Sequence, residues 1–428
     1  MTLGVLFLIF AILIVVGIPI GMVLTIAGLL PDLVGNFIVD APALVKAMIN
    51  GVDSFPILAV PMFILSGNIM AKGKISEKLF NFFAYFIGNL TAGLPIATIV
   101  TCLFYGAISG SGPATTAAVG AMTIPILVDK GYNKTFCTSL VAVAGGLGVI
   151  IPPSIPFIFY GQSSGESVGK LFIAGAIPGL LIGACLMIYS WFYCKKNGED
   201  KEKLNTYVKE LREEGIIKLF LSSFWALLSP VIILGSIYSG IASPTEAAVI
   251  SVFYALIVSA FIYKTVDFKI LFNILLDSAK TYSAILFIIA AAIGFSRVLT
   301  YYDAPTILTN IVTGAVSSKI GFLILVNLLL LFVGMIMDTT PAILILTSIL
   351  LPIAKAFNID PIHFGVMMVV NLAVGFVTPP LGVNLFVASS ISGEKIEDII
   401  KGAVPFILSF LVALVLITVI PAISLVLL

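Results

Sequence analysis

The chain has 428 residues, of which 60% are hydrophobic and 10% are charged, and its formal net charge is +1. Apolar runs of membrane-spanning length recur along it, so the composition excludes an ordinary soluble protein and favours a polytopic membrane protein. The near-zero net charge argues against a nucleic-acid surface. A metal site or catalytic triad would have to use the single histidine, His363, and the four cysteines lack metal-ligand spacing. We therefore expect no enzyme.

The first half is predicted to begin with long apolar segments. The run Leu3–Leu30 is interpreted as one retained helix, because no short basic segment and cleavage site precede it. The segment Ala43–Met70 follows and is interrupted by two prolines. Residues 79–127 form an apolar stretch too long for one helix, and glycine, serine and proline break it at Ser109–Pro113. Two helical arms that meet at such a turn predict a re-entrant hairpin near 87–128.

A different kind of interruption follows the hairpin. Residues 134–161 are predicted to form a broken transmembrane helix, interrupted by Gly145–Gly148 and by two adjacent prolines. A helix from Leu171 to about Tyr193 ends the first repeat, which we assign to residues 1–194. The hydrophilic segment 195–218 contains seven Lys/Arg residues. The positive-inside rule therefore predicts a cytoplasmic linker, with a short amphipathic helix over Thr206–Ile217 along the membrane surface.

The second repeat, predicted over 219–428, has the same order of elements. We expect a linking span at Phe220–Gly240, helices at Thr245–Tyr263 and Tyr282–Thr300, a hairpin near 320–354 turning at Gly334–Pro341, a broken helix near 361–389, and a last helix from about Pro405. Glu246 follows Ser243-Pro-Thr with the spacing of a capping box, so its expected role is structural. An odd number of crossings per repeat would orient the two halves oppositely in the membrane.

Both halves carry the same kind of break, made of glycine, proline and hydroxyl residues. Gly110-Ser-Gly-Pro-Ala-Thr-Thr116 and Ile151-Pro-Pro-Ser154 correspond to Met337-Asp-Thr-Thr-Pro-Ala342 and Thr378-Pro-Pro380. The prolines at 125, 152 and 178 each have a counterpart 227 residues later, at 352, 379 and 405 (352 − 125 = 227). Broken helices at related positions in two halves indicate the binding site of a transporter.

The breaks supply oxygen ligands. Unwound backbone within a membrane is tolerated only where it is buried in protein or lines a polar cavity, so we expect the two turns and two helix breaks to face one another. Carbonyl and hydroxyl oxygens suit a hard cation such as sodium. The hydroxyls at these breaks belong to Ser109, Ser111, Thr115, Thr116, Ser154, Thr339, Thr340 and Thr378. The competing interpretation is a set of helix kinks that serve only packing.

Two charged residues interrupt apolar segments of the second half. Arg297 follows Ala290-Ala-Ala-Ile-Gly-Phe-Ser, and Asp338 lies at the turn of the second hairpin. An ionisable residue within a span costs roughly 3 kcal/mol and normally faces a pathway or a partner. A guanidinium can hold a carboxylate by two parallel hydrogen bonds, so Arg297 is the candidate for an acidic substrate, unless it extends to the headgroups. Asp338 could pair with Arg297, ligate a cation or contact the substrate.

Taken together, five motifs resemble the large membrane subunit of the TRAP (tripartite ATP-independent periplasmic) transporters, within the ion-transporter superfamily. The resemblance covers essentially the whole chain, and the motifs read GAISGSGPATTAAVGAMTIPIL, GGLGVIIPPSIPFIFYG, SPTEAAV, GMIMDTTPAILILTSILLPI and GFVTPPLGVNLFVASSISG. The resemblance implies an all-α polytopic fold of two inverted repeats, each with a re-entrant hairpin and a broken helix. It also implies an elevator mechanism, in which a transport domain slides against a scaffold.

The resemblance further implies sodium as the coupling ion, with at least two sites where each hairpin turn meets the adjacent helix break. The expected sodium ligands are Ser109, Gly110, Gly112, Pro113, Gly145, Gly148 and Pro152 in the first half, and Gly334, Asp338, Thr339, Thr340, Gly375, Thr378 and Pro379 in the second. For the substrate we expect contacts from Arg297, Asp338, Ser154 and Asn384.

The expected partners are a small four-helix membrane subunit and a soluble periplasmic substrate-binding protein, in the inner membrane of a bacterium. The expected cargo is an organic acid of the sialic acid or C4-dicarboxylate type. The nearest alternative is a stand-alone sodium-coupled di- or tricarboxylate carrier of the same superfamily. An intramembrane enzyme using Asp338 as an acid would need a second carboxylate or a metal cluster, and a channel would conduct ions without substrate coupling.

Overall fold

A computed structural model of the chain describes residues 3–33, 40–213, 215–316 and 318–428, and these contain helices without any strand. Eight of the described helices are long and apolar enough to cross a membrane, judged by length and composition. Further apolar helices are shorter than a full span, as expected where a helix is broken or belongs to a hairpin. The predicted all-α polytopic fold is therefore confirmed.

The first half consists of twelve consecutive elements in the described ranges. They are α1 (Leu3–Val15), α2 (Ile20–Leu33), α3 (Ala41–Val52), the short 3-10 helix η1 (Phe55–Leu58), α4 (Ala59–Lys72), α5 (Ile75–Ile87), α6 (Gly93–Ser109), α7 (Gly112–Asp129), α8 (Lys134–Gly145), the 3-10 turn η2 (Gly146–Val149), α9 (Ile155–Ser164) and α10 (Val168–Asn197). The long break between α8 and α9 is the glycine- and proline-rich segment noted in the sequence.

The single helix expected over Leu3–Leu30 is wrong, because α1 and α2 are separate helices. Gly17 adopts a left-handed φ of +86° between them. Such a backbone conformation ends a right-handed helix, and Pro19 cannot donate the backbone hydrogen bond that would continue it. The long apolar run hides this Gly-Ile-Pro turn, since hydrophobicity alone does not report a change of direction.

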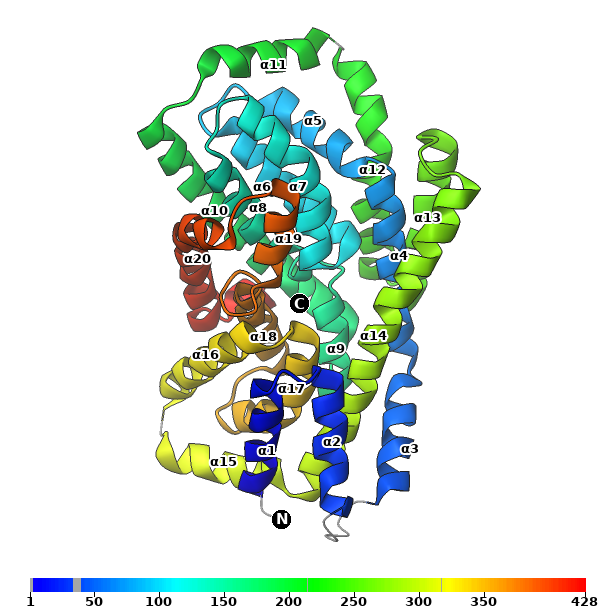
Figure 1. Ribbon diagram of the computed structural model, residues 1–428, viewed down its shortest axis with the longest axis vertical. Coiled ribbons are helices and arrows are strands. Elements are labelled where there is room, and N and C mark those ends of the chain that lie inside the picture. Colours follow the sequence, from blue (N-terminus) through cyan, green and yellow to red (C-terminus); the bar gives the residue numbers. More distant parts are fainter. Residues whose placement is uncertain (1–2, 34–39, 214, 317) are drawn as a thin grey trace.

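The hydrophilic linker contains the amphipathic helix α11 (Lys201–Glu213), which begins five residues before the range expected from the sequence. Figure 1 shows α11 lying across one end of the molecule, and its buried side chains pack towards α5. Next to it, the buried carboxylate of Glu199 accepts hydrogen bonds from the Ala92 amide at 2.9 Å and from the Tyr132 hydroxyl at 2.6 Å. Burial and this hydrogen bond raise the pKa of Tyr132. The linker thus holds both ends of the α6–α7 hairpin.

The second half consists of eleven elements in the described ranges. They are α12 (Ile216–Tyr238), α13 (Pro244–Leu256), the π-helical turn η3 (Ile257–Ile262), α14 (Phe268–Tyr301), α15 (Ala304–Ala315), α16 (Lys319–Ile336), α17 (Thr339–Ala356), α18 (Pro361–Gly375), α19 (Val383–Ser392), α20 (Ile396–Val419) and α21 (Ala422–Leu425). The capping box predicted at the start of α13 is present, with reciprocal hydrogen bonds between Ser243 and Glu246.

The order of elements from α6 to α10 recurs from α16 to α20, with matched helix starts. Ser111 and Asp338 are the N-caps of α7 and α17, and they are 227 residues apart (338 − 111 = 227). Asn133 and Asp360 cap α8 and α18 at the same spacing (360 − 133 = 227). The Pro152–Pro153 and Pro379–Pro380 peptide bonds are both cis. The side-chain oxygens of these four N-cap residues satisfy amide groups that the first turn of a helix leaves free.

Helices from the two halves interleave to form a central bundle. First-half helices α7 and α8 pack against α19, α8 and α10 pack against α20, and α9 packs against α17. An outer group of helices lies along one side, where α13 packs on α4, and α14 packs on α2, α3 and α4 (Figure 1). This outer group of α2, α3, α4, α13 and α14 touches the bundle mainly through α14 on α17 and through α4 on α6. Both hairpin turns and both helix breaks belong to the central bundle.

Candidate functional site

The turn of the first hairpin is a compact, buried set of oxygen atoms. Gly110 ends α6 with a left-handed φ of +61°, and Ser111 begins α7 as its N-cap. The Ser109 hydroxyl lies 2.9 Å from the Thr115 hydroxyl, which in turn donates to the Ser111 carbonyl at 2.8 Å. Gly112 is buried and Pro113 is half-buried at the start of α7. The Ile155 amide donates to the Gly110 carbonyl at 3.4 Å, which joins this turn to the first helix break.

The glycines of the first break let it approach the hairpin closely. A methyl group at Gly145 would overlap the Thr116 side chain, and one at Gly148 would overlap Thr115. Thr116 is fully buried, and its hydroxyl has no hydrogen-bond partner among the described residues. A buried hydroxyl without a partner carries a desolvation penalty of about 1–3 kcal/mol. The oxygen atoms at this junction therefore suit an additional ligand such as a hard cation.

The turn of the second hairpin has a different character. Asp338 caps α17 by accepting a hydrogen bond from the Thr339 amide at 2.8 Å, and its side chain is exposed, whereas Thr339 and Thr340 are buried. Gly375 of the second break lies directly against the backbone of Gly334, and any Cβ there would overlap that backbone. The Leu381 amide donates to the Met335 carbonyl at 3.0 Å.

The remaining polar residues of the second break point in other directions. Thr378 donates its hydroxyl back to the Val374 carbonyl within its own helix end. Pro379 follows it in the turn between α18 and α19. Gly334 and Gly375 lie where the hairpin turn meets the break, and backbone contact between these two glycines fills much of that junction.

Two of the four residues predicted to contact substrate form hydrogen bonds within the protein instead. The Ser154 hydroxyl caps α9, accepting from the Phe157 amide at 3.3 Å and donating to the Val149 carbonyl at 2.5 Å. Asn384 is fully buried, and its side-chain amide donates to the Ala142 carbonyl of α8 at 3.0 Å. The Asn384 side-chain oxygen has no partner among the described residues. Asn384 thus joins the broken helices of the two halves.

Arg297 lines a cavity of about 600 Å³ where four helices meet. The lining residues come from α3, α9, α14 and α17, and they are Ala43, Lys46, Ala47, Asn50, Gly51, Gln162, Ser163, Ile293, Ser296, Arg297, Thr300, Tyr301, Leu344 and Ser348. The Arg297 guanidinium lies 5.2 Å from the centre of the Tyr301 ring. This lining includes two cations and no carboxylate, a composition that favours an anionic guest.

Sequence reasoning missed Lys46. Its signal was a lysine within the apolar α3, followed four residues later by Asn50, so that both side chains share one helical face. Asp338, Ser154 and Asn384 are not among the residues that line this cavity. Among the described residues Arg297 and Asp338 form no ion pair, so the pairing considered from sequence is absent. The four predicted substrate residues are therefore not brought together here.

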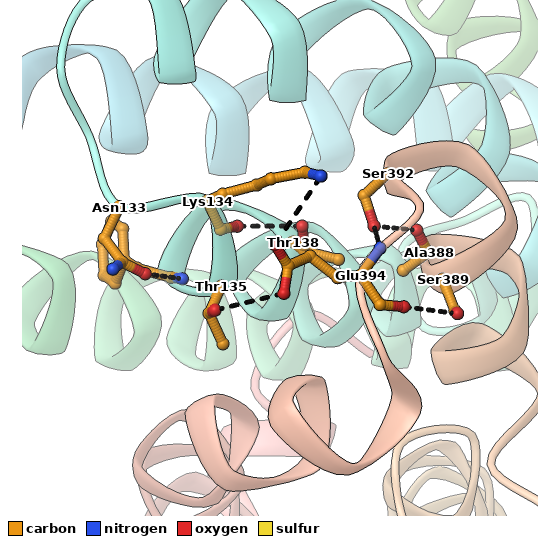
Figure 2. A network of polar contacts seen from close by, with 9 residues as sticks. Asn133, Lys134, Thr135, Thr138, Ala388, Ser389, Ser392 and Glu394 are labelled. Atoms are coloured by element: carbon orange, nitrogen blue, oxygen red, sulfur yellow. Dashed lines mark hydrogen bonds and ion pairs between the residues drawn. The ribbon is translucent and has the colours of Figure 1, made fainter.

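A polar network joins the two broken helices, as Figure 2 shows. The Lys134 ammonium at the start of α8 lies 3.6 Å from the Glu394 carboxylate, which also accepts from the Thr135 hydroxyl at 3.4 Å. Ser389 and Ser392 fix the backbone of Glu394 by hydrogen bonds of 2.7 and 3.1 Å. The network therefore ties the first-half break to the loop between α19 and α20.

Paired hairpins and broken helices in a polytopic helical bundle are typical of transporters. The model of the family described as "Tripartite ATP-independent periplasmic transporter, DctM component" matches residues 7–423, so the chain belongs to that family of large permease proteins. The chain is 43% identical to the isethionate TRAP transporter permease protein DctMQ of Oleidesulfovibrio alaskensis, over 98% of this chain and 65% of the relative. It thus spans about two thirds of that longer protein.

Other relatives match over comparable lengths. The C4-dicarboxylate TRAP transporter large permease protein DctM of Pseudomonas aeruginosa is 40% identical over 87% of this chain and 86% of its own length. The sialic acid TRAP transporter permease protein SiaT of Haemophilus influenzae is 36% identical over 97% of this chain and 66% of its own length. These relatives are transporter permeases, which points away from an enzyme.

Two solved structures share the fold at low sequence identity. The YdaH transporter of Alcanivorax borkumensis has a TM-score of 0.59 and 15% identity, covering 89% of each chain. The MtrF protein of Neisseria gonorrhoeae, described as illuminating a class of antimetabolite efflux pumps, has a TM-score of 0.57 and 17% identity, covering 88% of this chain and 84% of its own. At these identities the likeness concerns the arrangement of helices.

Proposed function

We propose that this chain is the membrane-spanning permease subunit of a sodium-coupled importer for an organic acid of the sialic acid or C4-dicarboxylate type. Family membership supports the permease role, and the names of the relatives support an acidic cargo. The observation that carries the proposal is the juxtaposition of hairpin turns and helix breaks inside one bundle, with a basic cavity beside them. Coupled transport needs a cation site and an anion site in one molecule, and this arrangement offers both.

The sodium assignment rests on the first junction in particular. The Ser109 and Thr115 hydroxyls and the Ser111 carbonyl are joined there by short contacts. The glycines at 145 and 148 let the break come close to Thr115 and to Thr116, whose hydroxyl has no partner among the described residues. Oxygen ligands of this kind favour a hard monovalent cation over a transition metal. The second junction, around Asp338 and Thr339, is the proposed location of another sodium ion, with a carboxylate nearby.

The proposed mechanism is an elevator movement. The central bundle carries both turns and both breaks, while the outer group of α2, α3, α4, α13 and α14 packs mainly on itself. We infer that the bundle slides past the outer group and carries cargo and ions together. The recurrence of α6–α10 in α16–α20 supports two inverted repeats, which would give the bundle equivalent outward and inward positions.

The proposed partners are a small membrane subunit and a periplasmic substrate-binding protein, with the complex in the inner membrane of a bacterium. The length of DctMQ beyond the part matched here, and its combined name, support a small-subunit partner. The family description supports a periplasmic component. The seven basic residues of 195–218 support a cytoplasmic position for α11.

Reconstitution into liposomes tests the proposal. The complex of permease, small subunit and binding protein is expected to accumulate radiolabelled sialic acid or succinate when an inward sodium gradient is imposed, and not when choline replaces sodium. Uptake by this chain alone would favour the stand-alone carrier instead. Uptake that does not depend on sodium would overturn the coupling, and ion flux without any solute uptake would indicate a channel.

A further inference from the structure

The cavity around Arg297 lies between the outer group of helices and the central bundle. Its walls come from α3 and α14 of the outer group and from α9 and α17 of the central bundle. Figure 1 shows α3 at the end of the molecule away from α11. None of the residues assigned to the proposed sodium junctions lines it. The cavity is therefore separate from those junctions, and movement of the bundle would change its shape.

The charges of the cavity are unbalanced. Lys46 projects from α3 and Arg297 from α14, and neither is ion-paired among the described residues. Two like charges in one concave site repel each other, and an anion between them relieves this repulsion. A cation that merely extends to lipid headgroups needs no cavity, whereas here Asn50, Gln162 and Ser348 add polar groups from three helices.

Arg297 is oriented for this task. Its guanidinium lies over the Tyr301 ring and forms no ion pair among the described residues, so its N–H groups remain available. A carboxylate or sulfonate meets such an edge by two parallel hydrogen bonds. The Lys46 ammonium is a point charge that can hold a second oxygen or a second acidic group of the same solute.

Resting on the proposed transport function, we propose that Lys46 and Arg297 form an entry site that captures a soluble organic anion, a carboxylate or sulfonate, before it reaches the sodium junctions. The site acts by local positive potential together with direct contact. Since it contains none of the proposed sodium ligands, its occupancy requires no sodium. The same chemistry could attract the phosphate of an anionic lipid, and the experiment distinguishes that source.

The test measures charge selectivity at a cysteine placed in the cavity. Asn50→Cys is introduced into the chain within its complex, and its rates of modification by anionic sulfonatoethyl and cationic trimethylammonioethyl methanethiosulfonate are compared. The ratio of the two rates cancels any change in thiol reactivity, because both reagents attack the same thiolate. Ser239→Cys is the control: Ser239 is exposed and does not line the cavity around Arg297, and Ser243, four residues further on, shares a second cavity with Gln162.

The anionic-to-cationic ratio is expected to be higher at residue 50 than at residue 239. Lys46→Gln and Arg297→Gln each remove one unit charge several ångströms from the cysteine. Each substitution should therefore lower the ratio roughly fivefold. Lys46→Arg and Arg297→Lys should keep it, which separates charge from folding. If the anionic-to-cationic ratio at residue 50 does not change in Lys46→Gln and in Arg297→Gln, the entry site is refuted.

Direct occupancy is tested by protection of the cysteine in choline medium. At least one of isethionate, succinate and sialic acid is expected to slow modification of Asn50→Cys, in phosphatidylcholine vesicles and without sodium. Protection by added phosphatidylglycerol with none from the three solutes would make this a lipid site and overturn the proposal. Sodium-dependent uptake is measured in the same vesicles. If uptake continues but the ratio of modification rates does not change when Lys46 or Arg297 is neutralised, the entry site is refuted and the transport function is not. If protection depends on these charges but no uptake occurs, the transport function is refuted.

Discussion

The two hairpin turns follow one plan but end in different surroundings. In the first, Ser109, Thr115 and Thr116 are buried, and side-chain oxygens meet the helix break. In the second, Asp338 reaches the surface, and the contact with the break is made by the backbones of Gly334 and Gly375. The protein that surrounds the first turn therefore holds its oxygen atoms in place. The second is exposed on one side, so a ligand or partner can still change its surroundings.

The first arms of the two hairpins show the same contrast. Nearly every residue of α6 is buried, from Gly93 to Ser109. On α16, by contrast, Ile324, Leu328 and Phe332 form one exposed face, with exposed fractions of 57%, 63% and 61%. Lipid can solvate such a face, but only α6 is fixed by protein on all sides. The contrast is confined to these first arms, because most residues of α17 are buried, whereas fewer than half of those of α7 are.

The largest expected effect comes from Gly375→Ala in the second half. Its Cβ would overlap the Gly334 backbone, which has no rotamer to change, so the junction must separate. We expect the unfolding free energy to fall by about 1–3 kcal/mol and uptake to be abolished. Thermal unfolding in detergent and liposome uptake measure both. Gly235→Ala in α12 is the control, since a Cβ there meets nothing within 4 Å, and wild-type behaviour of Gly375→Ala would refute the described contact.

Gly145→Ala tests the corresponding place in the first half and should act differently. Here the new Cβ meets mainly the Thr116 side chain, which can be displaced at the expense of the oxygen set. We expect the folded complex to persist, with the sodium concentration for half-maximal uptake raised about tenfold or more, equivalent to about 1.4 kcal/mol. An unchanged sodium dependence would remove this junction from the proposed sodium sites.

Thr116→Val isolates a single oxygen atom. The substitution keeps the shape of the side chain and removes a buried hydroxyl that has no protein partner, so the free energy of unfolding without sodium should be unchanged or slightly increased. If the hydroxyl ligates sodium, stabilisation by sodium should weaken, with an affinity roughly three- to tenfold lower. Sodium titrations followed by thermal unfolding measure this, and an equal sodium response in both proteins would count against the assignment.

Glu394→Gln should have the smallest effect. The Lys134–Glu394 ion pair is partly exposed and 3.6 Å long, and such pairs contribute about 1 kcal/mol or less. An amide oxygen can still accept from Thr135. We expect a stability loss below about 1 kcal/mol and nearly normal uptake. A much larger loss would show that this network, and not only the buried turns, fixes the two halves to each other.

The sequence predicted the local features well because each has a local physical cause. Glycine, proline and hydroxyl residues break helices wherever they cluster, and Ser243-Pro-Thr-Glu246 forms its cap from four adjacent residues. The turn at Gly17 was equally local, but the apolar run on both sides concealed it. Local signals thus predicted where helices bend.

What the sequence could not supply was the meeting of distant residues. Lys46 and Arg297 are 251 positions apart (297 − 46 = 251) and share a cavity only because α3 packs on α14. Asn384 was expected to bind substrate, yet its amide is used by the Ala142 carbonyl of the other half. A single sequence gives residue types and helical faces, whereas these outcomes depend on which helices become neighbours.

The interleaving of the two halves has a consequence for biosynthesis. Helices α7 and α8 leave the ribosome more than 200 residues before α19 and α20, the helices that cover them in the finished bundle. Until the second half is inserted, the broken first half carries free backbone groups that lipid cannot satisfy. Until then, the first half must therefore remain bound to the insertion machinery or in contact with water. Two separately expressed halves should each be degraded alone and survive together.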